Sequence, residues 1–458
     1  MKEVEIMKQV KRVMALCVSL SLLLSLFAVS GAAADKKDYK IISPYEDVIW
    51  EGDDAWGAYK GSLHSHTSYS DADEDLPTMV KEYYEQDYDF LANSDHGVTG
   101  VEWNRHQADQ FLYFYHSIPR VHLTDEEFAA ITNGTYPLYD GTIRNKKMVC
   151  VTGANELNNL TLTKCHVNGY FLPEGIGDGF GGRESGYDQA LSFIEENGGI
   201  SHINHPGDFL ESNKDITVVS DPKNVKYFGD LILKYDSCMG IEAFNDRNST
   251  TCYDRILWDN LLMYTLPYGK NVIGFSNTDA HDRENIDTSF SVFMMEENTV
   301  ENIKATMQSG AFFAVTRILR ANDIIGPAED IDVRNLGLSY PMFTKVAVDG
   351  HKVVVSAENC SSIQWIANGK IIATGEIGDD EITLDLDKIE GAEDFQYVRA
   401  ELYGEGGVCM TQALVIDDGS EKLQYEEPTG FKAFIDDVVE WFKGTRFWTI
   451  VVEVERML

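Results

Sequence analysis

The chain has 458 residues, of which 43% are hydrophobic and 25% are charged. This composition is ordinary for a globular protein and excludes a largely disordered, collagen-like or polytopic membrane protein. The formal net charge is −37, with 38 Lys and Arg against 75 Asp and Glu, which argues against a nucleic-acid polymer as partner because such a surface repels phosphate backbones.

The amino terminus is typical of a secretory signal peptide. Lys8, Lys11 and Arg12 precede an apolar run over residues 13–29, and a stretch of small residues ends at Ala34. This layout predicts cleavage after Ala34 rather than an uncleaved anchor. We therefore expect a secreted or extracytoplasmic protein with no membrane span after cleavage. The cysteines that remain permit disulfides whose pairing the sequence does not specify: Cys150, Cys165, Cys238, Cys252, Cys360 and Cys409.

After a linker at residues 35–59, apolar runs alternate with helical patterns as far as residue 325. Such alternation predicts a parallel sheet or a barrel. A break in the rhythm at residues 103–147 is long enough to be a lid or a binding loop. We expect buried strands at residues 88–93, 148–153, 199–204, 239–244 and 272–276, and helices at residues 76–86, 187–197 and 252–264.

The hydrophobic period changes to two beyond a polar linker at residues 327–338. Asp349-Gly350 and Asn368-Gly369 each separate two short apolar runs, which is a hairpin signal. With further strands expected at residues 382–386 and 397–416, residues 326–420 predict a small β-sandwich. The tail at residues 421–458 carries apolar residues at helical spacing, and its acidic residues favour docking onto the protein over binding to an anionic membrane.

Histidines and carboxylates gather where the predicted strands end. In His64-Ser65-His66 both imidazoles lie on one face of an extended segment. Each motif alone is a weak signal, but barrel enzymes collect reactive groups at the carboxyl ends of successive strands. Imidazole and carboxylate ligands suit zinc, manganese or iron. The candidates in chain order are His64, His66, Asp71, Asp95, His96, Glu156, His166, His202, His205, Asp279 and His281.

This ordered set, with His205 followed by Pro206 and with Asp279-x-His281 as its last member, resembles the PHP family (polymerase and histidinol phosphatase). The match spans about residues 60–285. The resemblance implies an α/β fold with a distorted, TIM-like (β/α)7 barrel over residues 60–325 that holds two or three divalent metal ions. The signal peptide and the sandwich look like the branch related to CehA/McbA-type hydrolases.

The resemblance also implies how the side chains divide among the ions. Asp71 stands where some relatives have His, which would change the preference of the third site. The first ion would be held by His64, His66, Glu156 and Asp279, the second by Glu156, His166 and His205, and the third by Asp71, His96 and His281.

Three neighbouring residues receive other roles. Asp95 would orient a ligand histidine, as carboxylates beside metal ligands commonly do. A structural role is the better interpretation of His202. Cys165 is adjacent to His166, and neighbouring strand residues point to opposite faces, so we do not expect it to be a ligand.

Metal-bound water loses a proton near pH ~7, so hydroxide would attack phosphorus or a carbonyl carbon. Arg247 follows the strand expected at residues 239–244, and Arg283 follows Asp279-x-His281. Each could bind a substrate anion or form a surface ion pair. Lys164 is a third candidate. A serine hydrolase is not needed, since no Gly-x-Ser-x-Gly elbow occurs.

The leading hypothesis is a secreted metal-dependent phosphoesterase (EC 3.1) acting on a small-molecule phosphoester or ester. An ester, amide or carbamate hydrolase using the same metals is the first alternative, because both reactions suit a metal hydroxide. The second alternative is an inactive barrel that serves as a surface-binding module. The sequence leaves the oligomeric state open.

Overall fold

The structure, a computed structural model, describes residues 38–109, 118–158, 165–179, 186–245, 251–319, 331–377, 381–427 and 438. The expected signal peptide, Lys164, Arg247 and most of the helical tail lie outside the described residues. Within the described part, no helix combines the length and the apolar character that a membrane crossing requires.

The larger of two central sheets joins both halves of the chain. Its order is β1-β21-β19-β20-β11-β10-β2-β3-β4, with β16 on β19 and β17 on β16. The strands are β1 (Lys40–Ile42), β2 (Gly57–Ser62), β3 (Phe90–Leu91), β4 (Val149–Cys150), β10 (Ser289–Met295), β11 (Phe312–Thr316), β16 (Ser362–Ala367), β17 (Lys370–Glu376), β19 (Tyr397–Gly404), β20 (Gly407–Met410) and β21 (Leu414–Asp417).

The second central sheet follows chain order. It consists of β5 (Asn155–Leu157), β6 (Val167–Tyr170), β7 (Ile200–Ile203), β8 (Cys238–Asn245) and β9 (Ile273–Asn277). Its first three strands are antiparallel and its last three are parallel. An apolar core that includes Leu63, Phe90, Phe275 and Phe293 joins the two sheets.

The expected distorted, TIM-like (β/α)7 barrel is therefore not what the strands of the described residues form. They divide between two sheets, neither of which closes on itself. β3 and β4 are only two residues long, and β5 and β6 form an antiparallel pair instead of a parallel one. Two isolated bridges link the sheets: Ser65, after β2, pairs with Ala280, after β9, and His96, after β3, pairs with Glu156 in β5. Strand ends from both sheets thus meet at one place.

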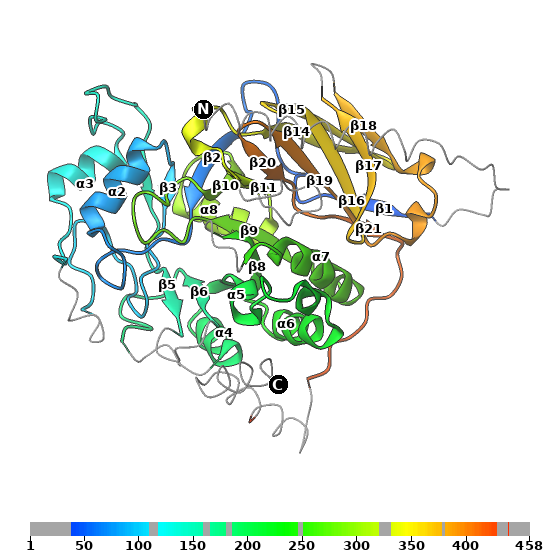
Figure 1. Ribbon diagram of the computed structural model, residues 1–458, viewed down its shortest axis with the longest axis horizontal. Helices are drawn as coiled ribbons and strands as arrows, with labels where there is room; N and C mark the ends of the chain where they lie inside the picture. Colours follow the sequence, from blue (N-terminus) through cyan, green and yellow to red (C-terminus); the bar gives the residue numbers. More distant parts are fainter. Residues whose placement is uncertain are drawn as a thin grey trace.

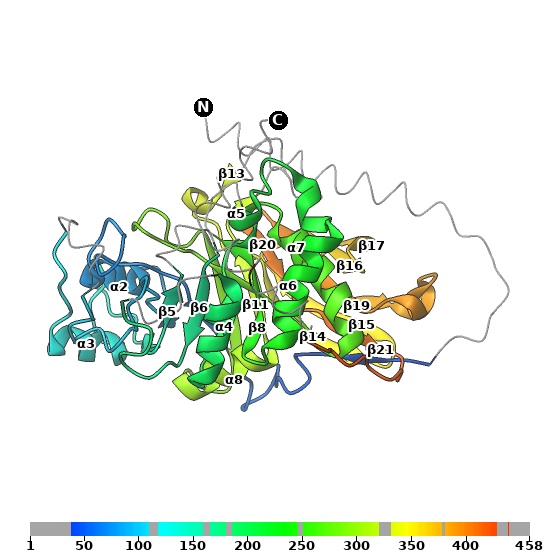
Figure 2. The ribbon, with the colours of Figure 1, turned by 90° about the horizontal axis from the view of Figure 1, so that it is seen from below.

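The helices expected from the sequence are present as α2 (Leu76–Glu85), α4 (Tyr187–Glu196) and α7 (Asp254–Thr265). Asp75 caps the amino terminus of α2, because its side chain accepts a hydrogen bond from the amide of Thr78. Figures 1 and 2 place α2 at one end of the molecule and the carboxyl-terminal strands at the other. The remaining helices are α3 (Asp125–Thr132), which lies in the insertion, α5 (Pro206–Leu210), α6 (Pro222–Lys234) and α8 (Val300–Ser309).

Both predicted hairpins are confirmed. β14 (Met342–Asp349) pairs with β15 (Lys352–Glu358), and β18 (Ile382–Asp385) completes a three-stranded sheet. β16 and β17 turn at Asn368 and Gly369, which have φ of 48° and 70°, as a type I′ turn requires. The expected linker contains β13 (Ile331–Asp332), which pairs with β12 (Ile318–Leu319). Because β11 pairs with β20, the carboxyl-terminal strands continue the sheet of the amino-terminal half.

Candidate metal centre

The centre forms where the segment after β2 pairs with the segment after β9. The amide of Asp279 donates to the carbonyl of His64, and the amide of His66 donates to the carbonyl of Ala280. Asp279 and His205 have φ of 47° and 26°, values that L-residues adopt rarely and that cluster at functional sites. This backbone pairing turns the carboxylate of Asp279 toward both imidazoles of the His64-x-His66 motif.

The first group of donor atoms consists of Nε2 of His64, Nε2 of His66, Oε2 of Glu156 and Oδ1 of Asp279. The two Nε2 atoms are 3.2 Å apart. The carboxylate oxygens lie 3.0–3.3 Å from these nitrogens. Four ligands of a tetrahedral zinc ion, each ~2.0–2.1 Å from the metal, are about 3.3 Å from one another. The spacing of the donor atoms therefore fits a small divalent ion.

Hydrogen bonds on the far side of each ring show which nitrogens are free. Nδ1 of His64 lies 2.8 Å from Glu242, and a carboxylate only accepts, so this nitrogen carries the proton. Ser70 donates to Asp95, so its hydroxyl oxygen accepts from Nδ1 of His66 at 3.2 Å. Both Nε2 atoms thus present lone pairs to two carboxylate oxygens. The two nitrogen lone pairs and the two carboxylate oxygens are four acceptors that face one another. A cation, or an additional proton on each ring, must therefore lie between them.

Among the described residues, the second group that could hold an ion combines Glu156 with His166 and His96. The expected ligand His205 is not part of this group, although it lies beside Glu156. Oε1 of Glu156 lies 3.1 Å from Nδ1 of His166 and 3.3 Å from Nε2 of His205, and it accepts a hydrogen bond from Asn204 at 2.7 Å. Oε2 faces the first group and also lies 3.2 Å from Nδ1 of His96. Glu156 is almost completely buried. It therefore stands between two donor groups, in the position of a bridging ligand.

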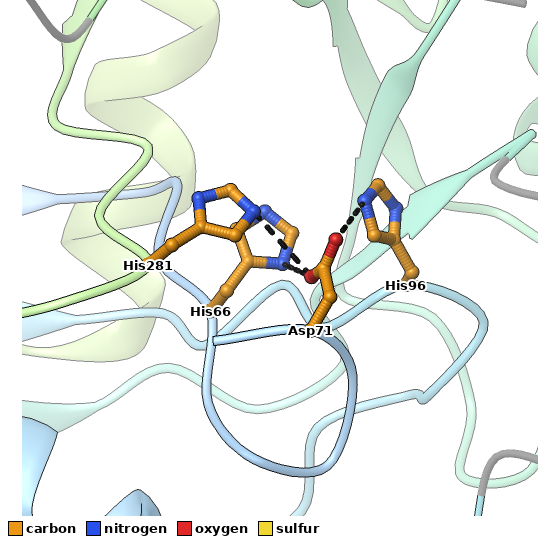
Figure 3. A group of neighbouring side chains, drawn as sticks. All are labelled: His66, Asp71, His96 and His281. Carbon is orange, nitrogen blue, oxygen red and sulfur yellow. Dashed lines mark ion pairs between the residues drawn. The ribbon is translucent and has the colours of Figure 1, made fainter. Parts of the chain in front are cut away.

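The third group surrounds the carboxylate of Asp71. Oδ1 lies 3.4 Å from Nε2 of His281 and 3.6 Å from Nδ1 of His66, and Oδ2 lies 3.7 Å from Nε2 of His96. Figure 3 shows this carboxylate between His66 and His281 on one side and His96 on the other. The structure thus brings Asp71, His96 and His281 together, and it adds His66 to this group.

The protonation of the cluster is shaped by burial and by the paired charges. Burial opposes the imidazolium form of His66, but hydrogen bonds to Asp279 and Glu156 outweigh it and raise the pKa of His66 to about 10. The pKa of His205 is raised to about 9, against burial, by Glu156 and Asp279. Burial would raise the pKa of both carboxyls, yet neighbouring imidazoles, His64 foremost, hold them well below their usual range. The ionised carboxylates therefore stabilise positive charge in the cluster, whether protons on the rings or a bound cation carry it.

Two residues that we did not single out from the sequence support the cluster. Glu242, in the middle of β8, accepts hydrogen bonds from His64, from the amide of His205 and from two asparagine side chains. Asn204 orients Glu156. The only sequence signal for Glu242 was a lone acid between Ile241 and Ala243 in a strand expected to be buried.

Asp95 and His202 lie behind the donor atoms. Asp95 accepts hydrogen bonds from the amide and the hydroxyl of Thr67 and from Ser70 at 2.6–2.7 Å, so it reaches His66 only through Ser70. Nε2 of His202 lies 2.8 Å from the hydroxyl of Tyr170. His202 belongs to none of the donor groups among the described residues, and neither does Cys165.

Arg283 is the predicted anion-binding arginine that the structure describes. Its side chain is 59% exposed, and Nε lies 3.1 Å from Oε1 of Glu74. This is the surface ion pair that the sequence offered as the alternative. Among the described residues, no contact of Arg283 turns its side chain toward the groups of metal-ligand atoms.

No protein-family model and no curated protein matches the chain. Three solved structures show limited similarity. A two-domain protein from Bacteroides vulgatus that contains a predicted PHP-like metal-dependent phosphoesterase is 12% identical, with a TM-score of 0.41, covering 84% of this chain and 100% of that one. The lesion-specific endonuclease EndoQ from Pyrococcus furiosus is 12% identical, with a TM-score of 0.31, over 55% and 56% of the two chains. A protein from Bifidobacterium adolescentis, assigned as a metal-dependent phosphoesterase, is 14% identical, with a TM-score of 0.27, over 50% and 90%.

Proposed function

We propose that the protein is a secreted, PHP-like metal-dependent hydrolase that cleaves small-molecule phosphoesters at a site for two or three divalent cations. One observation carries this proposal: the Nε2 atoms of His64 and His66 are 3.2 Å apart, and each lies 3.0–3.3 Å from the same two carboxylate oxygens of Glu156 and Asp279. Charged groups that are buried in a protein are paired with opposite charges or coordinate metal ions. Zinc, manganese and iron suit this mixture of nitrogen and oxygen ligands.

The side chains divide the work of holding the ions. His64, His66 and Asp279 would bind the first ion, His166 and His205 the second, and Glu156 would bridge them. Asp71, His96 and His281, with His66 at their side, would hold a third ion nearer the solvent, since the side chains of Asp71 and His281 are 35% and 38% exposed. When bound, the ions supply Lewis acidity and lower the pKa of a coordinated water.

The protein's own residues keep this arrangement ready for substrate. Glu242 and Ser70 hold the tautomers of His64 and His66, so that the rings need not reorganise when an ion binds. Asn204 fixes the rotamer of Glu156. A substrate oxyanion can approach from the side of Asp71 and His281, which is the exposed side of the cluster.

The decisive experiment is a double substitution, His64→Ala with His66→Ala, in the mature chain. We expect it to abolish hydrolysis of phosphate mono- and diesters and to reduce the bound metal found by elemental analysis, while the circular dichroism spectrum is unchanged. His122→Ala, an exposed histidine in the insertion, is the matched control. Full activity in the double variant would refute the proposal.

A parallel panel of carboxyl esters, amides and carbamates decides between the two hydrolase classes. Activity on these substrates alone would replace the phosphoesterase assignment, and bound metal without any turnover would favour the binding module. Export is tested separately by sequencing the amino terminus of protein recovered from the medium, which we expect to begin at Asp35.

A further inference from the structure

The turn that carries Asp71 is held from outside by the insertion at residues 103–147. This turn, residues 67–71, follows His66 directly. Its tip residues, Ser68 and Tyr69, are fully buried although they belong to a loop. Tyr69 contacts one short segment of the insertion, residues 103–109, and Ser68 contacts another, residues 118–123.

Each tip residue has its own partner in the insertion. The hydroxyl of Ser68 donates to the carbonyl of Pro119 at 2.9 Å, and Nε of Arg120 donates to the carbonyl of Ser68 at 3.2 Å. The hydroxyl of Tyr69 lies 3.0 Å from Nδ1 of His106, and the two rings meet edge to face with their centroids 5.3 Å apart.

Asp109 connects these two sets of contacts. Its Oδ2 lies 3.5 Å from Nε2 of His106, and its Oδ1 accepts a hydrogen bond from Nη1 of Arg120 at 3.3 Å. Tyr69, His106, Asp109, Arg120 and Ser68 therefore form a continuous circuit around the tip of the turn. The two segments of the insertion cannot shift independently without breaking a contact of this circuit.

The inner side of the turn has a different support. Asp95 accepts hydrogen bonds from Thr67 and Ser70 and so fixes the base of the turn. Among the described residues, no hydrogen bond joins Asp95 to Ser68 or Tyr69. If the base alone sufficed, the contacts with the insertion would be redundant. This competing explanation makes a different prediction for the variants below.

The carboxylate of Asp71 depends on the backbone for its position. Its oxygens lie 3.4–3.7 Å from the nearest imidazole nitrogens, which is longer than a normal hydrogen bond. In the described part of the chain, Oδ1 is buried and accepts no hydrogen bond. The imidazoles therefore attract the carboxylate through ion pairs without a hydrogen bond that fixes its direction, and the turn sets that direction.

We propose that His106 and Arg120 are positioning residues, which hold the turn through Tyr69 and Ser68 so that Asp71 stays within reach of His96 and His281. They thereby set the affinity of the third cation, and this inference rests on the proposed function of the cluster. Through these two residues, the insertion would control the metal content of the site without contributing a ligand.

The test is a zinc titration of the metal-free mature chain against a competing chelator. Asp71→Ala identifies the binding step that depends on the third group. In the double variant His106→Ala with Arg120→Ala, we expect this step to weaken at least tenfold while the other steps keep their affinities. When His106→Gln replaces His106→Ala in this double variant, the glutamine can still hydrogen-bond to Tyr69, so part of the lost zinc affinity should return. His122→Ala in the same insertion should match the wild type.

The outcomes separate the inference from the proposed function. An unchanged Asp71-dependent step in the double variant would show that Asp95 and the backbone hydrogen bonds of the turn, such as that from the amide of Ser68 to the carbonyl of Glu74, suffice to fix it. The inference would then be wrong. Equal weakening of every step, together with a lowered melting temperature, would show that the insertion is needed for the fold rather than for Asp71. A wild-type chain that binds no zinc would overturn the proposed function and the inference together.

Discussion

Glu242 accepts a hydrogen bond from Nδ1 of His64 at 2.8 Å, and this bond directs Nε2 of the same ring toward Glu156 and Asp279. Both side chains are fully buried. Carboxylates behind metal-binding imidazoles fix the tautomer, and their loss typically costs 10–100-fold in metal affinity. We expect Glu242→Gln to weaken binding of the first ion by that factor, as measured by chelator competition.

Glu242→Gln should disturb the site because the groups that contact the carboxylate of Glu242 are all hydrogen-bond donors. Its two oxygens accept from His64 and Asn277 on one side and from Asn245 and the amide of His205 on the other. A glutamine must place an NH2 group against two of these donors. Glu301→Gln, an exposed acid at the start of α8, controls for the loss of one charge. Unaltered affinity in Glu242→Gln would contradict the role assigned to the hydrogen bond.

Metal affinity should rise with pH because cations and protons compete for the same rings. The pKa values of His66 and His205, about 10 and 9 in the metal-free protein, mean that both rings are protonated at pH 7. Each proton displaced by an ion makes the apparent affinity about tenfold stronger per pH unit until the pKa is passed. We expect an increase throughout pH 6 to 9, measured in metal–chelator buffers, with protons released on binding.

Calorimetry in buffers of different ionisation enthalpy checks the same point independently. A heat of metal binding that does not depend on the buffer at pH 7 would show that the rings are already neutral. The imidazoles would then lack the protons that Glu156 and Asp279 are expected to stabilise, and the electrostatic account of the cluster would fail.

The parts of the centre that the sequence could predict are those that carry dense local signals. His64-x-His66 and Asp279-x-His281 each place two donors two residues apart, and the structure brings both pairs together. Glu242 carries no such signal, since its importance comes from the register of β8 against β9, where it lies opposite Phe275. Supporting residues depend on pairing between distant strands, which local spacing does not report.

The fold likewise has parts that the sequence could predict and parts that it could not. The hairpin around Asn368-Gly369 was predictable because the turn and both strands lie within the fifteen residues from Ser362 to Glu376. Whether a barrel closes depends on ladders between strands that are far apart in the chain, and here β3 ends at Leu91 after two residues. The antiparallel pair β5–β6 was missed because β5 is three residues long and contains Glu156, so it shows no apolar period.

Stability should fall in mild acid because of His202. Burial lowers the pKa of His202 to about 4, against 6.5 in the unfolded chain, and its Nδ1 is buried without a hydrogen-bond partner among the described residues. Between these values the unfolded state binds a proton that the folded state does not, so stability decreases as pH falls from 6.5 to 4. The shift of 6.5 − 4 = 2.5 units corresponds to about 3 kcal/mol.

Urea unfolding at pH 7 and pH 4.5, with chelator present, measures this loss. We expect His202→Gln to be less stable than the wild type at pH 7 and to lose less stability on acidification. Comparing the two proteins cancels the titration of the other histidines. A variant that lost as much stability as the wild type between the two pH values would rule out His202 as the source.

A buried network of charges joins α7 to β19. Arg399 is completely buried, and its Nε and Nη2 donate to the two oxygens of Asp259 at 2.8 and 2.7 Å. Nη1 of Arg399 and Nη1 of Arg255 both donate to Oε1 of Glu401 at 2.5 Å. The four charges balance: Arg255 and Asp259 lie on α7, and Arg399 and Glu401 lie on β19. The network thus couples the helix after β8 to the carboxyl-terminal strands.

Removing one partner leaves a buried charge uncompensated, which typically costs 3–5 kcal/mol. We therefore expect Asp259→Ala to lower the free energy of unfolding by about that amount, measured in urea. Asp230→Ala, which breaks the pair with the exposed Lys226 and a hydrogen bond from Tyr264, should cost only about 1–2 kcal/mol. The double variant Asp259→Leu with Arg399→Met should recover much of the loss, because it removes the unpaired charge as well as its partner. Equal effects of Asp259→Ala and Asp230→Ala would mean that the network is not needed, and that the sheet shared through β11 and β20 alone joins the two halves.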